Sequence, residues 1–379
     1  MNCFNICKKV CSLSFFNHSS KYFSVLQRLP KMNFSTFNNK KKKLNVCVFG
    51  TGSFGTALGT VAARAGHDVT IVGRTKEIIN EINESNSNSK YFKELKLPLN
   101  LKATSDKDAV KSCDLIIHAL PVQISVSSLK EYEGKIKDGT PIIIASKGIL
   151  LKEKKFISEI WNDIFRKERN IQHMILSGPS FAIELIKNFP TVVTLGCRDI
   201  QLAKSVQKAL SYEGFRIYTT DDVIGVEIGG ALKNVVAIMA GLIEGFGYKY
   251  NTLCACLTRC VLEISLFSKE FGGRAETLHG LSGIGDIMLS SLGDLSRNKN
   301  VGLALARGET IEQIIEKSLE VAEGVPTLKV LHEIIKEHNL NMPLCNTAYQ
   351  VAYEKLSIEE AKKRIMLRVY EEEYELSIK

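Results

Sequence analysis

The stretch Val46-Cys-Val-Phe-Gly-Thr-Gly-Ser-Phe-Gly55 decides the fold of this chain, because an apolar, strand-like run leads directly into the pattern Gly-x-Gly-x-x-Gly. A helix is predicted to begin near Ser53, so the loop joins a strand to a helix. In such a loop Gly50 permits the tight turn, Gly52 lets a pyrophosphate approach the backbone, and Gly55 lets the helix pack closely on the strand. The N-terminus of the helix also favours an anion. The loop therefore predicts dinucleotide binding. The alternative, a glycine-rich turn without a ligand, is weakened by the second strand predicted after the helix.

Short β-branched runs alternate with helix-length amphipathic segments from Asn45 to about Asp221, which is the pattern of βαβ units. The predicted strands are Asn45–Phe49, Asp68–Val72, Asp114–His118, Pro141–Ala145, His173–Leu176, Thr191–Leu195 and Phe215–Tyr218. The predicted helices between them include Phe54–Ala65, Lys76–Glu84, Lys154–Phe165 and Ile200–Leu210. Strands such as Pro141–Ala145 are apolar on both faces, as in a parallel sheet that helices cover on each side. We therefore expect an α/β fold with an N-terminal, Rossmann-like, doubly wound sheet.

Beyond about Asp221 the strand pattern stops, and helices joined by short Gly-containing turns follow. The predicted helices are Gly225–Phe246, Leu253–Phe271, Ser296–Ala306, Ile311–Lys317, Val325–His338 and Met342–Tyr353. We expect a leader over residues 1–43, a dinucleotide-binding domain over 44–220 and an all-α substrate and catalytic domain over 221–379. The active site should lie between these two domains, outside the carboxyl ends of the strands. The helical domain should also offer the surface of a homodimer.

The composition is that of an ordinary globular protein, with 45% apolar and 24% charged residues, and no run approaches the roughly 18 apolar residues of a membrane span. The net charge is +9, but residues 1–43 hold nine Lys and Arg and no Asp or Glu, so the remaining 41 basic and 41 acidic residues balance. A neutral body lacks the broad basic face that nucleic-acid binding requires. We therefore expect neither a nucleic-acid partner nor a membrane-spanning segment.

The first 43 residues are rich in Ser, Asn, Phe and Lys and end in the four lysines 40–43. Lys8 and Lys9 interrupt the apolar stretch that a secretory signal needs, so the composition favours an organelle transit peptide. This predicts the matrix of a plastid or a mitochondrion as the compartment. The alternative is a disordered extension of a cytoplasmic protein, in a chain whose many Asn and Lys residues reflect codon bias.

The ten cysteines form no Cys-x-x-Cys pair, and the nearest cluster, Cys254, Cys256 and Cys260, lies in an apolar stretch that is predicted to be helical. This is not the spacing of zinc ligands. Buried, reduced thiols are the expected state, and no metal site is predicted.

The residues after the second predicted strand bear on the choice of dinucleotide. NAD enzymes commonly place a carboxylate there for the ribose 2′-hydroxyl, whereas this chain has Gly73-Arg74-Thr75. The guanidinium of Arg74 can pair with a 2′-phosphate or lie over the adenine face. These residues leave the choice of dinucleotide open, and the expected cofactor is NAD, with NADP also possible.

Lys233 is the only ionisable residue in the apolar segment Ile228–Ile243, which has helical periodicity. Burial depresses the pKa of a lysine, and this is how a lysine becomes an acid–base group near neutral pH. The alternative is a lysine that extends along the helix surface to water, which its apolar neighbours disfavour. The adjacent Asn234 can donate to a substrate oxygen.

Other polar residues interrupt Gly-rich stretches, where a ligand can approach the backbone. Each of these, taken alone, is more often part of a turn than of a site. The sequence Ser296-Arg-Asn298 begins a helix and so offers a hydroxyl, a guanidinium and free N–H groups to an anion. Together they indicate a small phosphorylated substrate. The interrupting residues are Lys147 in Ala145–Gly148, Ser180 in Ser177–Ala182, and Asp286 after Gly280–Gly285.

These segments, in this order and spacing, resemble the NAD(P)-dependent glycerol-3-phosphate dehydrogenases, especially the bacterial and plastid type. The resemblance covers about residues 45–365, and its lysine–asparagine segment is the most specific part. Phe54 and Ser290-Ser291 depart from the family pattern, where Trp and Thr-Cys are common, but both changes keep the needed chemistry. The segments are Gly178-Pro-Ser-Phe-Ala182, Gly225-Val-Glu-Ile-Gly-Gly-Ala-Leu-Lys-Asn-Val235, Gly283-Ile-Gly-Asp286 and Ser296-Arg-Asn298.

The resemblance implies reversible hydride transfer between the nicotinamide and C2 of glycerol 3-phosphate, which gives dihydroxyacetone phosphate and serves glycerolipid synthesis and redox balance. It implies that Lys233 moves the proton and that Lys147 and Asp286 orient the substrate and tune Lys233. The substrate would also contact Gly178, Ser180 and Asn234, with Ser296, Arg297 and Asn298 holding its phosphate. The residues that the resemblance places on the cofactor are Ser53, Phe54, Arg74, Lys147, Ala182, Arg297 and Glu323, beside Gly50, Gly52 and Gly55.

Two alternatives remain. A β-hydroxyacid dehydrogenase of the 6-phosphogluconate or hydroxyisobutyrate kind also joins a Rossmann domain to helices and uses a Lys-Asn pair, but the predicted phosphate pocket at Ser296–Asn298 favours glycerol 3-phosphate. A regulatory module that binds the dinucleotide without turnover is the other alternative, and the intact Lys233 disfavours it.

Overall fold

The structure is a computed structural model that describes residues 42–165, 172–317 and 322–366. Residues Lys41–Lys379 belong to one compact unit. The predicted leader lies outside the described residues except for its last two positions.

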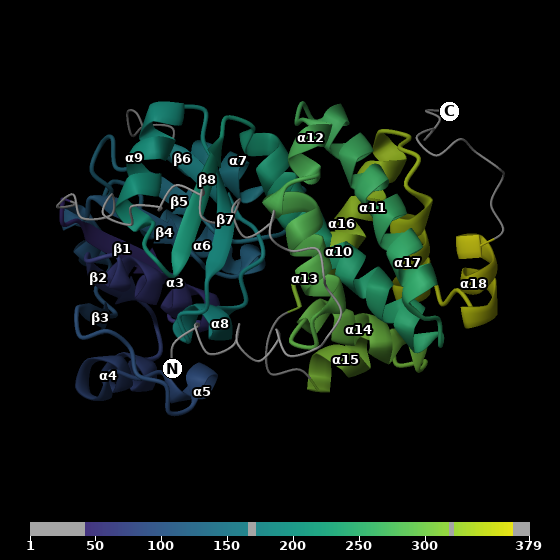
Figure 1. Cartoon of the computed structure of the whole chain (residues 1–379), viewed down its shortest axis with the longest axis horizontal. Coiled ribbons are helices and arrows are strands. Elements are labelled where there is room, and N and C mark those ends of the chain that lie inside the picture. The colour runs from purple at the N-terminus through teal and green to yellow at the C-terminus, as the bar shows by residue number, and fades with distance from the viewer. Residues whose placement is uncertain (1–41, 166–171, 318–321, 367–379) are drawn as a thin grey trace, which may run out of the picture. The chain divides into compact units, whose positions relative to one another are not determined.

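A mostly parallel sheet occupies the first half of this unit (Figure 1), with the strand order β3-β2-β1-β4-β5-β6-β7-β8 in the described part of the chain. This confirms the predicted α/β fold with a Rossmann-like sheet. β1 is central and pairs with both β2 and β4, so that Phe49 lies between Val72 and His118 at the carboxyl edge. The strands are β1 (Asn45–Phe49), β2 (Asp68–Val72), β3 (Leu101–Thr104), β4 (Leu115–His118), β5 (Ile142–Ile144), β6 (His173–Ser177), β7 (Thr191–Gly196) and β8 (Phe215–Thr220).

Two features of the sheet differ from the sequence prediction. Strand β3 was not predicted, because its four residues alternate between buried and exposed and include Lys102, which gives a weak apolar signal. Strand β7 runs antiparallel to β6, with Ile175 opposite Gly196, a reversal within the expected parallel sheet that the sequence analysis did not predict. Strands β7 and β8 alternate buried with less buried residues, a pattern that suits an antiparallel or edge position better than a fully covered one.

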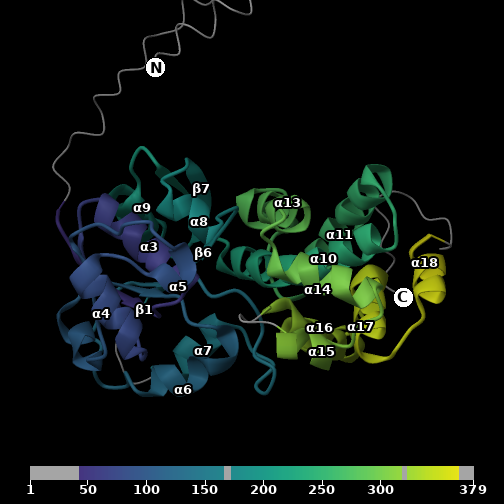
Figure 2. The same cartoon turned by 90° about the horizontal axis from the view of Figure 1, so that it is seen from below.

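Helices cover both faces of the sheet (Figure 2), and alternate strand residues point to opposite sides. Val46 and Val48 of β1 pack into one buried cluster with α3, α4, α8 and α9, while Cys47 and Phe49 pack into another with α6 and α7. The helices are α3 (Ser53–Arg64), α4 (Lys76–Ser85), α5 (Ser89–Phe92), α6 (Ser125–Lys130), α7 (Ile157–Ile164), α8 (Ala182–Ile186) and α9 (Ile200–Leu210), with 3₁₀ turns at Lys107–Ser112 and Val122–Ile124.

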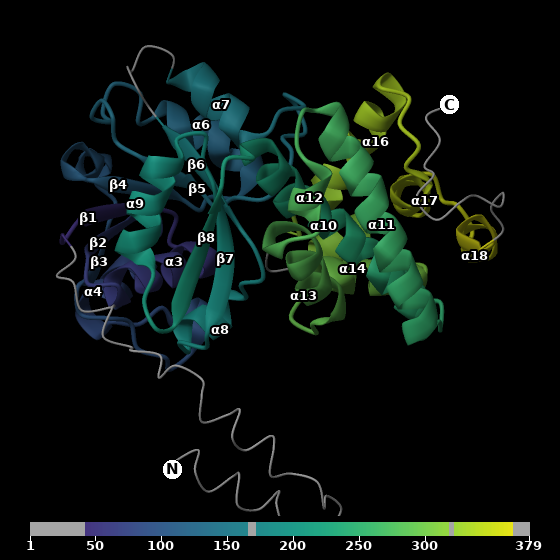
Figure 3. The ribbon, with the colours of Figure 1, turned by 45° about the horizontal axis from the view of Figure 1, so that its top comes forward.

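The second half is helical, as predicted, and is built around α10 (Figure 3). Short helices α12 and α13, the π-helical turn between them and the helix α18 were not predicted, because each is too short or too polar to show a clear apolar period. The elements are α10 (Val223–Gly245), α11 (Tyr250–Glu270), α12 (Ala275–Leu278), the turn Leu281–Gly285, α13 (Asp286–Leu292), α14 (Arg297–Ala306), α15 (Ile311–Lys317), α16 (Gly324–Glu337), α17 (Pro343–Tyr353) and α18 (Ile358–Met366).

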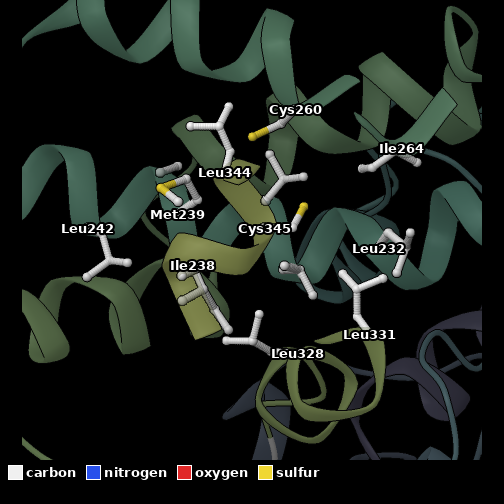
Figure 4. Close-up of a cluster of buried hydrophobic side chains, with 14 of the residues drawn as sticks. Leu232, Ile238, Met239, Leu242, Cys260, Ile264, Leu328, Leu331, Leu344 and Cys345 are labelled. Carbon is white, nitrogen blue, oxygen red and sulfur yellow. The ribbon is translucent and has the colours of Figure 1, made fainter. Parts of the chain in front are cut away.

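Helix α10 is the core of the helical half. Figure 4 shows its residues Leu232, Ile238 and Leu242 among apolar side chains from α11, α16 and α17. Over 18 residues its mean hydropathy is 1.6, which by length and composition is enough for a membrane span, although Lys233 and Asn234 interrupt its apolar run. However, 89% of that stretch is buried inside the protein, as in the core helix of a globular domain.

Helix α10 crosses α14 with the two backbones in contact. A Cβ atom on Gly241 would lie 2.1 Å from the carbonyl oxygen of Lys299, and one on Gly302 would lie 2.0 Å from that of Ile238. Because any larger residue at either position would push the helices apart, this glycine crossing fixes how α14 lies on α10.

Candidate active site

The glycine loop between β1 and α3 has the geometry that its sequence predicts. Gly50 has a φ of +112° and donates its N–H to the carbonyl of Val72 at 2.9 Å. A Cβ on Gly55 would lie 2.0 Å from the carbonyl oxygen of Gly50, so only glycine lets α3 pack this closely. A Cβ on Gly52, in contrast, would meet nothing within 4 Å. This open side of the loop faces the N-terminus of a helix and suits the pyrophosphate of a dinucleotide.

The other residues predicted to touch the cofactor lie around this loop or near the carboxyl edge. Ser53 and Phe54 are half-buried in the first turn of α3, and the Phe54 ring centroid lies 5.8 Å from Nζ of Lys147. Ala182 is half-buried at the first position of α8, and Arg74 is exposed just after β2. The structure thus brings Phe54 and Lys147 together.

Asp286 lies between the two predicted lysines. Its Oδ1 accepts from Nζ of Lys233 at 2.5 Å, and its Oδ2 accepts from Nζ of Lys147 at 2.6 Å. The carboxylate is fully buried, while each lysine side chain remains 13% exposed. The three residues come from the start of α13, the middle of α10 and the loop after β5, so the site joins the sheet to the helical half.

Further hydrogen bonds fix this centre. Oδ2 of Asp286 also accepts from the Gly178 N–H at 3.3 Å and the Ser177 hydroxyl at 3.4 Å, and Lys233 donates to Oγ of Ser290 at 2.9 Å. Ser290 therefore places its hydroxyl on the lysine, a contact that the sequence analysis did not predict. The carboxylate has donors on both oxygens, which is the requirement for a buried charge.

The charges shift one another's protonation. Burial lowers the pKa of Lys233 to about 8, with Asp286 opposing this shift and Lys147 adding to it. Burial alone would raise the pKa of Asp286, but Lys147 and Lys233 together hold it below its usual range. At neutral pH the centre thus contains an ionised aspartate beside a lysine whose pKa lies close to the working pH, so that this lysine can readily release and regain its proton.

Local sequence explains how α13 comes so close to α10. A Cβ on Gly229 would lie 2.5 Å from the carbonyl oxygen of Ser282, so glycine at this position lets the π-helical turn Leu281–Gly285 pack directly on α10. Asp286 follows this turn and is thereby directed at Lys233, one turn further along α10.

A chain of amide hydrogen bonds connects this centre to the start of α14. Asn234 donates to the Lys147 carbonyl at 3.4 Å and accepts from Nδ2 of Asn298 at 2.9 Å, and Oδ1 of Asn298 accepts from the Gly324 N–H at 2.9 Å. Ser296 caps α14 by accepting from the Lys299 N–H at 3.3 Å, and Arg297 is exposed in the first turn. The residues predicted to hold a phosphate therefore surround one helix N-terminus, linked to Asn234.

Glu323, just before α16, also connects the helical half to the sheet half, through the loop after β4. Its Oε1 accepts from the Val122 N–H at 2.9 Å, and its Oε2 is buried without a hydrogen-bond partner among the described residues. Burial raises the pKa of Glu323 to about 7, although the Val122 N–H and the charge of Arg297 oppose the shift. A buried oxygen of this kind is available to a donor from a bound ligand.

Ser180, which was predicted to contact the substrate, makes a hydrogen bond within its own loop. The Ser180 hydroxyl donates to the Gly178 carbonyl at 2.9 Å, within its own loop. This contact is that of a turn, one of the alternatives weighed for this stretch. Among residues that sequence reasoning missed, Ser177 contacts Asp286 and Asn88 contacts the glycine loop. Ser177 ends β6 directly after the three apolar residues Met174, Ile175 and Leu176, a signal that could have identified it.

No group of three His, Cys, Asp or Glu side chains in the described part of the chain is placed to hold a metal. Of the cysteines on α11, Cys256 and Cys260 are buried as expected, but Cys254 is exposed, which corrects the expectation that all three are buried. Cys254 lies one turn after the start of α11, on the side away from the core.

A glycine loop at the carboxyl edge of a Rossmann-like sheet, beside a buried lysine that a helical domain supplies, defines the class of NAD(P)-dependent dehydrogenases. The family model for the N-terminus of NAD-dependent glycerol-3-phosphate dehydrogenase matches residues 45–203, and the model for its C-terminus matches residues 222–363. The chain belongs to the NAD-dependent glycerol-3-phosphate dehydrogenase family.

Known glycerol-3-phosphate dehydrogenases are similar to this chain over nearly their whole length. A glycerol-3-phosphate dehydrogenase (NAD(P)+) of Leptospira biflexa is 39% identical over 86% of this chain and 98% of its own, and one of Staphylococcus aureus is 37% identical over 85% and 98%. The crystal structure of glycerol-3-phosphate dehydrogenase from Coxiella burnetii superposes with a TM-score of 0.80 at 30% identity, covering 86% of this chain and 99% of that one. The predicted enzyme class and NAD(P) dependence are thereby confirmed.

Proposed function

We propose that Lys233 is the general acid–base group with which this dehydrogenase interconverts sn-glycerol 3-phosphate and dihydroxyacetone phosphate. The observation that carries this proposal is the contact of Lys233 with both Asp286 and Ser290, together with its lowered pKa. A lysine with a pKa near 8 can both accept and donate a proton at working pH.

The nicotinamide, when bound, accepts or supplies the hydride at C2. In the oxidation of glycerol 3-phosphate, the neutral amine of Lys233 accepts the proton of the C2 hydroxyl. In the reduction of dihydroxyacetone phosphate, the ammonium form donates this proton to the oxygen at C2. Asp286 holds Nζ of Lys233 in position. Lys147 binds the other oxygen of Asp286, and its ammonium group would lie close to the substrate and help to orient it.

The substrate phosphate is proposed to lie at the N-terminus of α14, where Ser296, Arg297 and Asn298 supply a hydroxyl, a guanidinium and an amide. Asn298 already bonds to Asn234, next to Lys233 in α10, which supports a phosphate pocket adjacent to the proton-transfer group. Gly178 and Ser180 would line the opposite side of the substrate.

The cofactor is proposed to place its pyrophosphate on Gly50, Gly52 and Gly55. Phe54 and Lys147 already lie together near this loop, and the unpartnered oxygen of Glu323 would accept from the nicotinamide end. Around these groups, Ser53, Arg74, Ala182 and Arg297 complete the proposed cofactor contacts. Arg74 would meet the adenosine ribose and so set the preference between NAD and NADP.

Steady-state kinetics with dihydroxyacetone phosphate, measured side by side with NADH and NADPH, tests the proposed function. We expect turnover with at least one reduced cofactor, and a larger effect of Arg74→Ala on KM for NADPH than for NADH because only NADPH carries the 2′-phosphate. Turnover of 6-phosphogluconate or 3-hydroxyisobutyrate in place of glycerol 3-phosphate would favour a β-hydroxyacid dehydrogenase. Binding of NADH with no turnover of any of these substrates would favour a regulatory module.

The lowered pKa of Lys233 predicts opposite pH dependences for the two directions. Reduction requires the ammonium form, so its kcat/KM should fall as the pH rises through about 8, while oxidation requires the neutral amine and its kcat/KM should rise through about 8. Initial rates between pH 6 and 10 in both directions measure this. A pH-independent rate across that range in both directions would contradict the role of Lys233.

We also propose a compartment and an assembly. The acid-free leader supports import into a plastid or mitochondrion, where the enzyme would supply glycerol 3-phosphate for glycerolipid synthesis and balance reduced and oxidised dinucleotide. A fluorescent reporter fused to residues 1–43 tests this, and a diffuse cytosolic signal would contradict it.

The exposed Met288, Leu292 and Leu295 of the helical half support a homodimer, which light scattering of the purified chain would reveal as twice the monomer mass.

A further inference from the structure

Asn88 lies in the segment between α4 and α5 and is wholly buried. Its side-chain amide donates to two groups at the start of the cofactor helix: the carbonyl of Thr51 at 3.1 Å and the hydroxyl of Thr56 at 2.9 Å. The Thr56 hydroxyl in turn donates to the Thr51 carbonyl at 3.4 Å. These three residues thus form a closed, buried set of hydrogen bonds directly beneath the glycine loop.

The Thr51 carbonyl shares its peptide unit with the N–H of Gly52. The described residues contain no cis peptide bond, so this unit is trans, and its C=O and N–H point in opposite directions. When Asn88 and Thr56 hold the carbonyl towards the interior, the Gly52 N–H is turned to the opposite, outer side of the loop. A Cβ on Gly52 would meet nothing within 4 Å, so Gly52 borders open space.

We propose that Asn88 is a positioning residue for the dinucleotide: by holding the Thr51 carbonyl, it presents the Gly52 N–H to the pyrophosphate before the cofactor binds. This inference rests on the proposed placement of the pyrophosphate on Gly50–Gly55. Its energetic basis is preorganisation, because a loop that is already oriented loses less conformational freedom when the ligand binds.

The orientation of the Asn88 amide follows from its partners. The Thr51 carbonyl accepts only, so the amide nitrogen and not the amide oxygen must face it. Oδ1 of Asn88 is buried and has no hydrogen-bond partner among the described residues. A buried oxygen without a partner costs stability, so what Asn88 contributes at this position comes from its amide nitrogen.

Asn100 offers a matched control. Its side-chain amide also donates to two oxygens, the carbonyls of Ala63 at 2.8 Å and His67 at 2.7 Å, but these lie at the opposite end of α3. Asn88→Ala and Asn100→Ala therefore each remove one amide hydrogen bond to α3 and one to the segment that flanks it, and only Asn88→Ala changes the end that bears the glycine loop.

The test compares the Kd for NADH, by fluorescence titration, with the thermal unfolding temperature of the full chain. Both variants should lower the unfolding temperature. Asn88→Ala should raise the Kd and KM for NADH about tenfold and leave the KM for dihydroxyacetone phosphate at saturating NADH within about twofold, whereas Asn100→Ala should leave all three constants within about twofold. An equal Kd in both variants would overturn the inference.

A second variant keeps the test decisive if Asn88→Ala does not fold. Thr56→Val preserves the shape of the side chain and removes the hydroxyl that accepts from Asn88 and itself donates to the Thr51 carbonyl. The carbonyl then loses one of its two side-chain donors, so the Kd for NADH should rise about threefold to tenfold. An unchanged Kd in Thr56→Val would then overturn the inference. Gly52→Val separates the proposed pyrophosphate site from the proposed role of Asn88. If Gly52→Val leaves NADH binding intact, the placement of the pyrophosphate is wrong. If Gly52→Val blocks NADH binding while Asn88→Ala leaves it unchanged, only the role of Asn88 is wrong.

Discussion

Lys233→Met is expected to lower kcat by about 10²- to 10⁴-fold in both directions while leaving the Kd for NADH within about threefold of the unchanged protein. Methionine has nearly the length of lysine and fills the same apolar space in α10, but it can neither accept nor donate the proton at C2. Asp286 keeps its bond to Lys147 in this variant, so its charge stays paired. Single-turnover and steady-state rates, with NADH titrations beside them, measure the two effects separately.

Lys299→Met is the control for this variant. Lys299 is another buried lysine, on α14, and pairs with Glu244 at 3.0 Å instead of with Asp286. Its replacement should lower the free energy of unfolding without a comparable loss of kcat. If Lys233→Met retained more than about a tenth of the original kcat, the assignment of proton transfer to Lys233 would be wrong.

Gly52→Val should abolish dinucleotide binding without unfolding the protein. Gly52 has a φ of −73° and a ψ of 179°, an extended conformation that valine adopts easily, and its Cβ would meet no protein atom within 4 Å. The valine side chain would instead fill the space proposed for the pyrophosphate and remove its bonds to backbone N–H groups. The Kd for NADH should rise at least about 100-fold, or about 3 kcal/mol, measured by fluorescence titration beside thermal unfolding.

Gly55→Ala, in contrast to Gly52→Val, should lower the stability of the protein. Its Cβ would lie 2.0 Å from the Gly50 carbonyl oxygen, so the loop and helix must shift, and we expect a loss of about 1–3 kcal/mol in the free energy of unfolding. A Gly52→Val protein that bound NADH normally, or that lost as much stability as Gly55→Ala, would contradict this account of the loop.

The α/β architecture was predictable from sequence because the buried strands have clear apolar patterns. β1, β2 and α9 have the bounds predicted from their apolar patterns, and Gly50, Gly52 and Gly55 were assigned from the strand and helix around them. Strand β3 escaped prediction because an edge strand needs only one apolar face over four residues. The antiparallel β7 was missed because the direction of a strand depends on how its connection returns, which apolar periodicity does not encode.

The residues of the site could be named from sequence, but their contacts could not. Lys233 was recognisable as the only charge in an apolar helix, yet its pairing with Asp286 spans 53 residues and that of Lys147 with Asp286 spans 139. The packing of α13 on α10 brings Asp286 to Lys233, and the loop after β5 brings Lys147 to the same carboxylate. Asn88 gave no signal, because it lies in the polar run Asn86-Ser-Asn-Ser89, where a surface loop would have been the natural prediction.

The glycine crossing of α10 and α14 has a consequence for substrate choice. Lys233 and Ser296 lie on these two helices, and because backbone meets backbone at Gly241 and Gly302, no side chain can adjust the separation between them. The proposed proton-transfer group, Lys233, and the proposed phosphate pocket at Ser296 are therefore held at a fixed separation. If both assignments hold, a substrate with one carbon more or fewer between its phosphate and its reacting carbon would reach only one of these two groups, so we expect the enzyme to select its substrate by length as well as by charge.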